Sequence, residues 1–184
     1  MTIAVKVRVT AEDYRSLPES GQQYQLIEGD LYMAPAPNRF HQDISRNIEF
    51  CLLKYLDQHP VGKVYDAPFD VYLNNDNVFQ PDLVFVAHEN NQVFTDAGVE
   101  GVPDLVVEIL SPRTARLDRD PKRRVYGTCG VKEFWLVDPE AHTVAVYYLR
   151  QNASQPAAVY TTTDQFTSSF IPGLVFVVAD FFRQ

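Results

Sequence analysis

Two short apolar runs that carry acidic residues constrain this chain more than any other feature. Residues 80–86 read QPDLVFV, and residues 103–110 read PDLVVEIL. Runs rich in Val, Ile and Phe are typical of strands. Each run also holds a carboxylate, Asp82 or Glu108, where a buried strand should be apolar. We therefore treat these two side chains as candidates for a functional site.

The positions of the two carboxylates suggest that they meet. Asp82 begins its strand, whereas Glu108 lies near the end of its own. If the strands pair antiparallel, the start of one lies beside the end of the other. We expect residues 87–101 to form a loop that permits this pairing. The alternation of side chains along the second strand places four residues on one face: Asp104, Val106, Glu108 and Leu110.

A basic segment follows the second strand. It begins at Arg113 and includes the run Asp120-Pro121-Lys122-Arg123-Arg124. We expect a helix here, limited by Gly127 and Gly130, with Lys122 in its first turn after a proline that this position tolerates. From there its long stem can reach toward Glu108.

Two adjacent carboxylates repel each other, and a hard divalent cation removes that penalty. Mg²⁺ is commonly held by one or two carboxylates plus water. Two acids and a lysine therefore indicate a metal site that acts on a phosphodiester. Each residue also has a structural interpretation: Asp82 as a turn cap, Glu108 as the partner of an arginine, and Lys122 as a solvated helix residue.

Composition sets wider limits. The length of 184 residues and the hydrophobic fraction of 46% suit a single domain, residues 1–184. No apolar run approaches a membrane span or a secretory signal, and we expect Cys51 and Cys129 to be free thiols in the cytoplasm. The net charge of -8 argues against nucleic acid, although the local basic segment can still bind a phosphate backbone.

The remaining patterns indicate an α+β order with a mixed sheet and a few helices. Apolar positions at helical spacing predict a helix over 39–58, capped by Asn38. Thr10 is the expected cap of a short helix, and residues 24–33 predict a hairpin that turns at Gly29. We also expect a hairpin formed by 133–138 and 143–149, and short strands to the C-terminal end.

A long motif carries a resemblance to a known family. It comprises 106–114 (VVEILSPRT), then Asp118, Arg119, Lys122 and Tyr126, then 130–139 (GVKEFWLVDP). With 24–30, His41-Gln42, 80–82 and 171–174, the chain resembles the Uma-type restriction endonuclease family of the PD-(D/E)XK nuclease superfamily. The resemblance implies a restriction-endonuclease-like central mixed β-sheet flanked by helices.

The resemblance also implies site residues. Asp82, Glu108 and the carbonyl of Ile109 would bind Mg²⁺ or Mn²⁺. Leu110 occupies the place of the superfamily lysine, so Lys122 is the expected substitute, with Arg119 and Arg123 as competitors. Two further matches to family positions have a supporting role in metal binding or orientation: Glu28 and His41. His41 is equally well explained as a partly buried hydrogen-bonding residue, while Gln80 and Tyr126 are weaker candidates.

Two hypotheses about function remain. The first is a metal-dependent DNA endonuclease, possible as a homodimer, with four arginines on the DNA: Arg113, Arg116, Arg119 and Arg123. The second is a non-catalytic DNA- or protein-binding module on the nuclease scaffold. The acids and the lysine favour the first, whereas the net charge of -8 and Leu110 favour the second. The sequence contains no nucleophile motif such as G-x-S-x-G, so it gives no support to a third hypothesis, an unrelated hydrolase.

Overall fold

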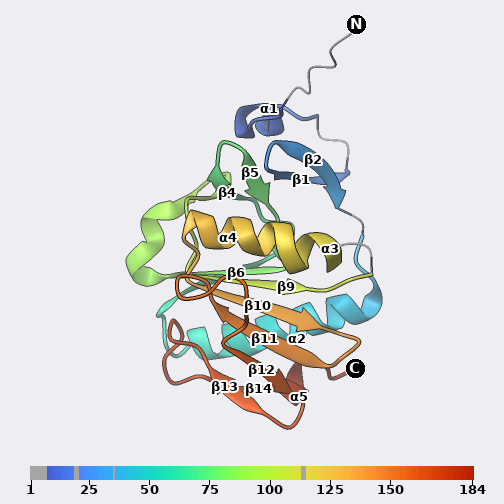
Figure 1. The fold of residues 1–184 in the computed structure, drawn as a ribbon. Coiled ribbons are helices and arrows are strands. Elements are labelled where there is room, and N and C mark those ends of the chain that lie inside the picture. Colours follow the sequence, from blue (N-terminus) through green and yellow to red (C-terminus); the bar gives the residue numbers. More distant parts are fainter. Residues whose placement is uncertain (1–7, 19–20, 35, 113–114) are drawn as a thin grey trace, which may run out of the picture.

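Two six-stranded sheets and the helices around them make up most of this protein (Figure 1). The computed structural model describes residues 8–18, 21–34, 36–112 and 115–184, without the side chain of Arg116. The helical segments are α1 (Ala11–Arg15), α2 (Arg39–Leu56), the 3₁₀ helix η1 (His88–Val93), α3 (Ala115–Leu117), the π-helical turn η2 (Asp118–Lys122), α4 (Arg123–Cys129) and α5 (Val178–Phe181).

The sheet that holds both acidic strands has the order β12-β11-β10-β9-β6-β3. Its strands are β3 (Gly62–Asp66), β6 (Leu83–Ala87), β9 (Leu105–Ile109), β10 (Glu133–Asp138), β11 (Thr143–Tyr148) and β12 (Ala158–Thr161). The predicted antiparallel pairing of the acidic strands is confirmed, since Leu83 of β6 faces Val107 of β9. Because β9 also pairs parallel with β10, the sheet is mixed, as expected.

Helices cover both faces of this sheet, and the alternation along β9 explains how (Figure 1). Leu105, Val107 and Ile109 lie on one face. They pack there with Ile44 and Ile48 of α2. Val106 packs on the other face with Val125 of α4. The predicted cap of α2 is confirmed, because Asn38 Oδ1 accepts a hydrogen bond of 2.9 Å from the amide of His41.

A second sheet, with the order β2-β1-β5-β4-β8-β7, was not anticipated. Its strands are β1 (Gln23–Ile27), β2 (Asp30–Ala34), β4 (Val71–Asn74), β5 (Asn77–Phe79), β7 (Phe94–Thr95) and β8 (Gly98–Glu100). The prediction of a plain loop over 87–101 is wrong, since this segment holds η1, β7 and β8. The tertiary contact of β8 with β4 decides this local structure. A Cβ at Gly98 would lie 2.2 Å from the Asp70 carbonyl oxygen, so only glycine permits that approach.

The basic segment differs from its expected form. The helix begins at Ala115 rather than next to Pro121, and Lys122 ends the π-helical turn η2 instead of opening the first turn. Pro121 has no amide hydrogen to donate, which disfavours a regular α-helical turn, and the wider turn accommodates it. Arg113 lies outside the described residues.

The other expected elements are present. The β1–β2 hairpin turns at Gly29, β10 pairs with β11, and Thr10 caps α1. The C-terminal end is a hairpin of β13 (Gln165–Thr167) and β14 (Val175–Val177) followed by α5, so the expectation of strands up to the end is wrong for the last segment. Both cysteines are free. Within the described ranges, none of the helices combines the length and the hydropathy that crossing a membrane requires.

Candidate active site

Five of the residues expected from the sequence line one pocket of about 440 Å³: His41, Asp82, Glu108, Ile109 and Lys122. They come from α2, from the start of β6, from the end of β9 and from η2. The end of β2, the start of α2 and α3 lie on the same side of the molecule, at the right of Figure 1. The pocket therefore forms where the two sheets and two helices meet.

The side chain of Asp82 is hydrogen-bonded to the neighbouring strand β9. The amide of Ile109 donates a hydrogen bond of 2.6 Å to Asp82 Oδ2. His41 Nε2 lies 3.3 Å from the same oxygen and 3.0 Å from the Ile109 carbonyl oxygen. Asp82 therefore does more than cap a turn, because it ties the two acidic strands together at the pocket.

Glu108 is the centre of a buried polar cluster. Its Oε1 lies 2.5 Å from Lys122 Nζ and accepts a hydrogen bond of 2.7 Å from the Tyr126 hydroxyl. Lys122 Nζ also lies 3.1 Å from Asp118 Oδ1. The side chains of Lys122 and Asp118 are only 3% and 4% exposed. Lys122 is therefore not a solvated helix residue, and the partner of Glu108 is this lysine rather than an arginine.

Burial and charge act against each other in this cluster. Burial alone would lower the pKa of Lys122, but the carboxylates of Glu108 and Asp118 outweigh it and raise the pKa, so the ammonium stays charged. Burial raises the pKa of Glu108, and the positive charge of Lys122 opposes that rise. A bound divalent cation would oppose it as well, so this carboxylate gains from a metal.

His41 contacts two expected metal ligands, Asp82 and Ile109, through its Nε2 atom. Burial alone would lower its pKa, but the hydrogen bond and charge of Asp82 outweigh burial, and the pKa is raised. Its Nδ1 is buried and has no hydrogen-bond partner among the described residues. One ring nitrogen of the imidazole is therefore unpaired among the described residues and shielded from solvent.

The donor atoms suit a hard cation. The side-chain contacts of Asp82 and Glu108 with other described residues use only Oδ2 and Oε1, so in the described part of the chain Asp82 Oδ1 and Glu108 Oε2 accept no hydrogen bond. No three His, Cys, Asp or Glu side chains among the described residues are grouped to hold a metal. A site here would need two carboxylates, a main-chain carbonyl and water, and Mg²⁺ is commonly held in that way.

The comparisons with known proteins point the same way. Residues 11–179 match the family Uma2, which is described as "Putative restriction endonuclease". The chain belongs to the Uma2 family. It is 23% identical to the uncharacterized protein sll1609 of Synechocystis sp. over 159 residues, which cover 80% of this chain and 84% of that protein.

The fold of this Uma2 protein is also that of a solved structure. The crystal structure of a "putative nuclease belonging to DUF820" from Anabaena variabilis superposes with a TM-score of 0.79 at 20% identity. The match covers 95% of this chain and 97% of that one. The restriction-endonuclease-like fold expected from the sequence is therefore confirmed.

Gln80, a weaker candidate from the sequence, also lines the pocket, and its Nε2 donates a hydrogen bond of 2.8 Å to Asp70 Oδ1. Three other sequence candidates do not line the pocket. Glu28 does not line it, and its Oε2 instead pairs with Arg124 at 2.8 Å on the surface. Arg119 pairs with Asp138 at 2.8 Å beside a smaller neighbouring cavity. Arg123 donates a hydrogen bond to the Arg119 carbonyl, and its side chain is 11% exposed. Arg113 and the side chain of Arg116 are outside the described part of this Uma2 chain.

Sequence reasoning gave no role to one member of the buried cluster, Asp118, although its spacing of four residues from Lys122 is the signal of an ion pair along a helix. Tyr126, a weaker candidate from the sequence, is buried and donates a hydrogen bond to Glu108. That contact joins α4 to β9, and no local pattern predicts it.

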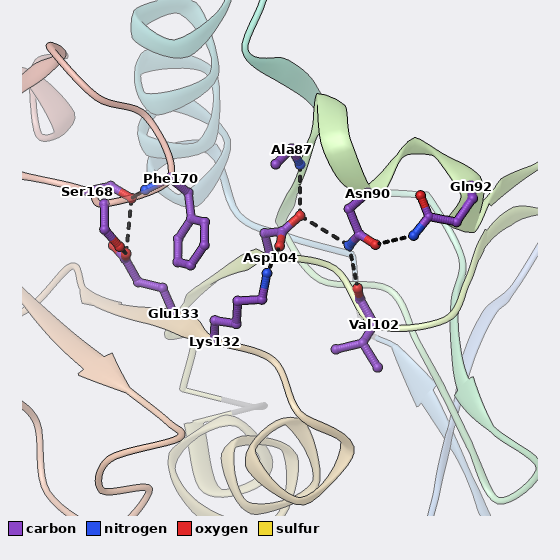
Figure 2. A network of polar contacts seen from close by, with 10 residues as sticks. Ala87, Asn90, Gln92, Val102, Asp104, Lys132, Glu133, Ser168 and Phe170 are labelled. Atoms are coloured by element: carbon purple, nitrogen blue, oxygen red, sulfur yellow. Dashed lines mark hydrogen bonds and ion pairs between the residues drawn. The ribbon is translucent and has the colours of Figure 1, made fainter.

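A second polar network lies at the opposite end of β9, around Asp104, which directly precedes the strand (Figure 2). Lys132 Nζ lies 2.6 Å from Asp104 Oδ1. Asp104 Oδ2 accepts hydrogen bonds from the Ala87 amide and from Asn90 Nδ2. Figure 2 shows these groups converging on the carboxylate, which is fully buried, so we assign Asp104 a structural role.

Proposed function

We propose that this Uma2-family protein is a DNA endonuclease that depends on Mg²⁺ or Mn²⁺ and hydrolyses phosphodiester bonds. The observation that carries the proposal is the contact of 2.5 Å between Lys122 of η2 and Glu108 of β9. This contact places a lysine beside one of the two acidic residues, Asp82 and Glu108, although Leu110 occupies the position of the superfamily lysine. The family and the solved relative, both described as nucleases, support the same class of chemistry.

In this proposal, Asp82, Glu108 and the Ile109 carbonyl are the protein groups that would hold the ion. A carbonyl oxygen has two lone pairs, so Ile109 can keep its contact with His41. A bound divalent ion lowers the pKa of a coordinated water and polarises a phosphoryl oxygen. His41 orients Asp82 by its hydrogen bond.

Lys122 supplies fixed positive charge at the pocket. Two carboxylates hold its ammonium, and η2 and α4 support its backbone. Asp118 would hold the ammonium beside Glu108 if Glu108 were also a metal ligand. Lys122 then stabilises the negative charge that develops on the phosphoryl oxygens, which is an electrostatic role.

Arg119 is the proposed phosphate contact next to the pocket, because 55% of its side chain is exposed. Glu28 is proposed to contribute to the site only indirectly, by fixing the side chain of Arg124 through their ion pair. Cleavage of both strands is readily achieved by two active sites, so we also propose a homodimer. Light scattering that gives the mass of a monomer would remove the dimer and leave the chemistry untouched.

The non-catalytic alternative is favoured by one observation, the net charge of -8. A plasmid-nicking assay separates the two functions. We expect nicking with Mg²⁺ or Mn²⁺ by the wild type and none by Glu108→Gln, which keeps the shape of the side chain. Calorimetric titration of Mn²⁺ should show binding that Asp82→Ala abolishes. Metal binding without nicking would favour the non-catalytic module, and equal Mn²⁺ affinity in both proteins would remove the metal site.

A further inference from the structure

The pocket is lined by two chemically different groups of side chains. The first is charged: four carboxylates and one lysine, which include the catalytic candidates Glu108 and Lys122. The second is neutral and includes the amides of Gln23 and Gln25 from β1 and of Gln42 from α2. An amide offers both a donor and an acceptor, which matches the edge of a nucleobase, whereas phosphates are contacted mainly by cations and amide hydrogens.

Two of these amides are free to bind. Gln23 and Gln42 are both exposed, and neither side chain has a hydrogen-bond partner among the described residues. Gln25 is used in part, since its Oε1 accepts a hydrogen bond of 3.3 Å from the Gln80 amide. The unpaired amides therefore line the pocket from two separate elements, the β1–β2 hairpin and the start of α2.

The register of the hairpin adds an aromatic side chain to this lining. Gln25 is paired with Tyr32, and Gln23 with Ala34. Paired residues of antiparallel strands project from the same face, and three of these four residues line the pocket. Tyr32 therefore extends the pocket lining. It is 37% exposed and has no ring or hydrogen-bond partner among the described residues.

Three described arginines of the basic segment are already paired. The side chains of Arg119, Arg123 and Arg124 each pair with a carboxylate. A phosphate would have to displace those carboxylates, and the net charge of -8 opposes its approach. Recognition therefore needs neutral groups beside the phosphate contact proposed for Arg119.

We propose that the β1–β2 hairpin and the start of α2 recognise the bases beside the scissile phosphate. Gln23 and Gln42 hydrogen-bond to base edges, and Tyr32 stacks on a base. A two-stranded ribbon fits the major groove of DNA, and stacking on an aromatic ring is available to every base. This inference rests on the proposed nuclease function, and it adds that the protein prefers particular bases next to the cut.

The test maps cleavage sites. Plasmid DNA of mixed sequence is partly digested with Mn²⁺, and the new ends are sequenced to give base frequencies on both sides of the cut. The variants are Gln23→Met and Gln42→Met, which keep the side-chain volume, and Tyr32→Leu. Gln165→Met is the matched control, because Gln165 is also an exposed amide on a strand but lies on the distant β13–β14 hairpin.

We expect the wild type and Gln165→Met to share one base preference beside the cut. Gln23→Met or Gln42→Met should weaken the preference at one position at least about fivefold, the discrimination expected of one good base contact. Unchanged base frequencies in both Gln variants, or cleavage by the wild type without any preference, overturn the inference and leave the nuclease intact. Equal amounts of new ends from the wild type and Glu108→Gln overturn the nuclease proposal and this inference together.

Discussion

Lys122 is the residue on which the proposed chemistry depends. Methionine at this position keeps most of the stem and removes the ammonium that contacts Glu108 and Asp118. Loss of one electrostatic donor typically costs about 100- to 1000-fold in the chemical step. We predict that Lys122→Met retains Mn²⁺ binding but cleaves slower by this factor in single-turnover assays at saturating Mn²⁺.

The exposed cation Arg119 supplies the comparison for Lys122. As a proposed phosphate contact, Arg119→Met should weaken DNA binding in a salt-dependent way and leave the single-turnover rate at saturating DNA nearly unchanged. If Arg119→Met slows that rate more than Lys122→Met does, the catalytic cation is the arginine.

Asp118 holds the lysine in place through its contact with Lys122 Nζ. Partners that orient a functional group typically cost about 10- to 100-fold in activity when they are changed. We predict that Asp118→Asn lowers kcat by this amount with a smaller change in KM. Asp120→Asn is the control, because Asp120 belongs to the same turn but 76% of its side chain is exposed. Activity restored by Asp118→Glu would support positioning by charge, and equal effects at Asp118 and Asp120 would contradict it.

At the scale of elements, the Asp104 network joins three parts of the chain that the sequence separates. It connects the end of β6, η1 and the loop before β10 to the start of β9 (Figure 2). Asp104 is fully buried. Asp104→Asn would leave Lys132 without its charge partner. It would also place the NH₂ group of asparagine among hydrogen-bond donors, which the carboxylate oxygens now accept from.

We predict that Asp104→Asn lowers the free energy of unfolding by about 1–3 kcal/mol, the usual cost of an unsatisfied buried polar group. Asp96→Asn changes an exposed acid in the same 87–101 segment and should have little effect. Urea denaturation of both variants checks the difference. An unchanged midpoint for Asp104→Asn would mean that the network adds nothing to stability.

The stability of the whole molecule should depend on pH through Glu133. This carboxylate is fully buried and accepts hydrogen bonds from Trp135 and Ser168. Burial raises its pKa, and the hydrogen bonds only partly oppose the rise. The folded state therefore binds this proton more tightly than the unfolded state, in which the pKa is about 4.3. The contribution of Glu133 to stability falls as the pH rises from that value through the raised folded pKa.

Glutamine at position 133 cannot ionise and keeps a similar shape. We predict that the free energy of unfolding of Glu133→Gln, relative to wild type, increases between pH 4 and pH 8. Thermal unfolding at several pH values measures this difference. A difference that is constant over the whole range would show that Glu133 has the same pKa in both states.

How well an element could be predicted from the sequence depends on how far apart along the chain its stabilising residues lie. The strands around Asp82 and Glu108, the helix capped by Asn38 and the turn at Gly29 depend on neighbouring residues and on periodicity, and they were predicted. The pairing of the two acidic strands follows from their order and their carboxylates. The second sheet was not predicted, because β7 and β8 are too short to carry a pattern and form only by pairing with each other and with β4.

The sequence by itself determined which residue types were available for chemistry: two acids on adjacent strands and a lysine on the next helix. Only the tertiary structure decided how they are used. Lys122 reaches Glu108 because η2 widens around Pro121, and Asp118 becomes its second partner through the same turn. Glu28 projects away from the pocket, whereas Gln23 and Gln42 line it. The physical reason is that contacts between distant segments depend on packing and turn geometry, which short patterns in a sequence do not encode.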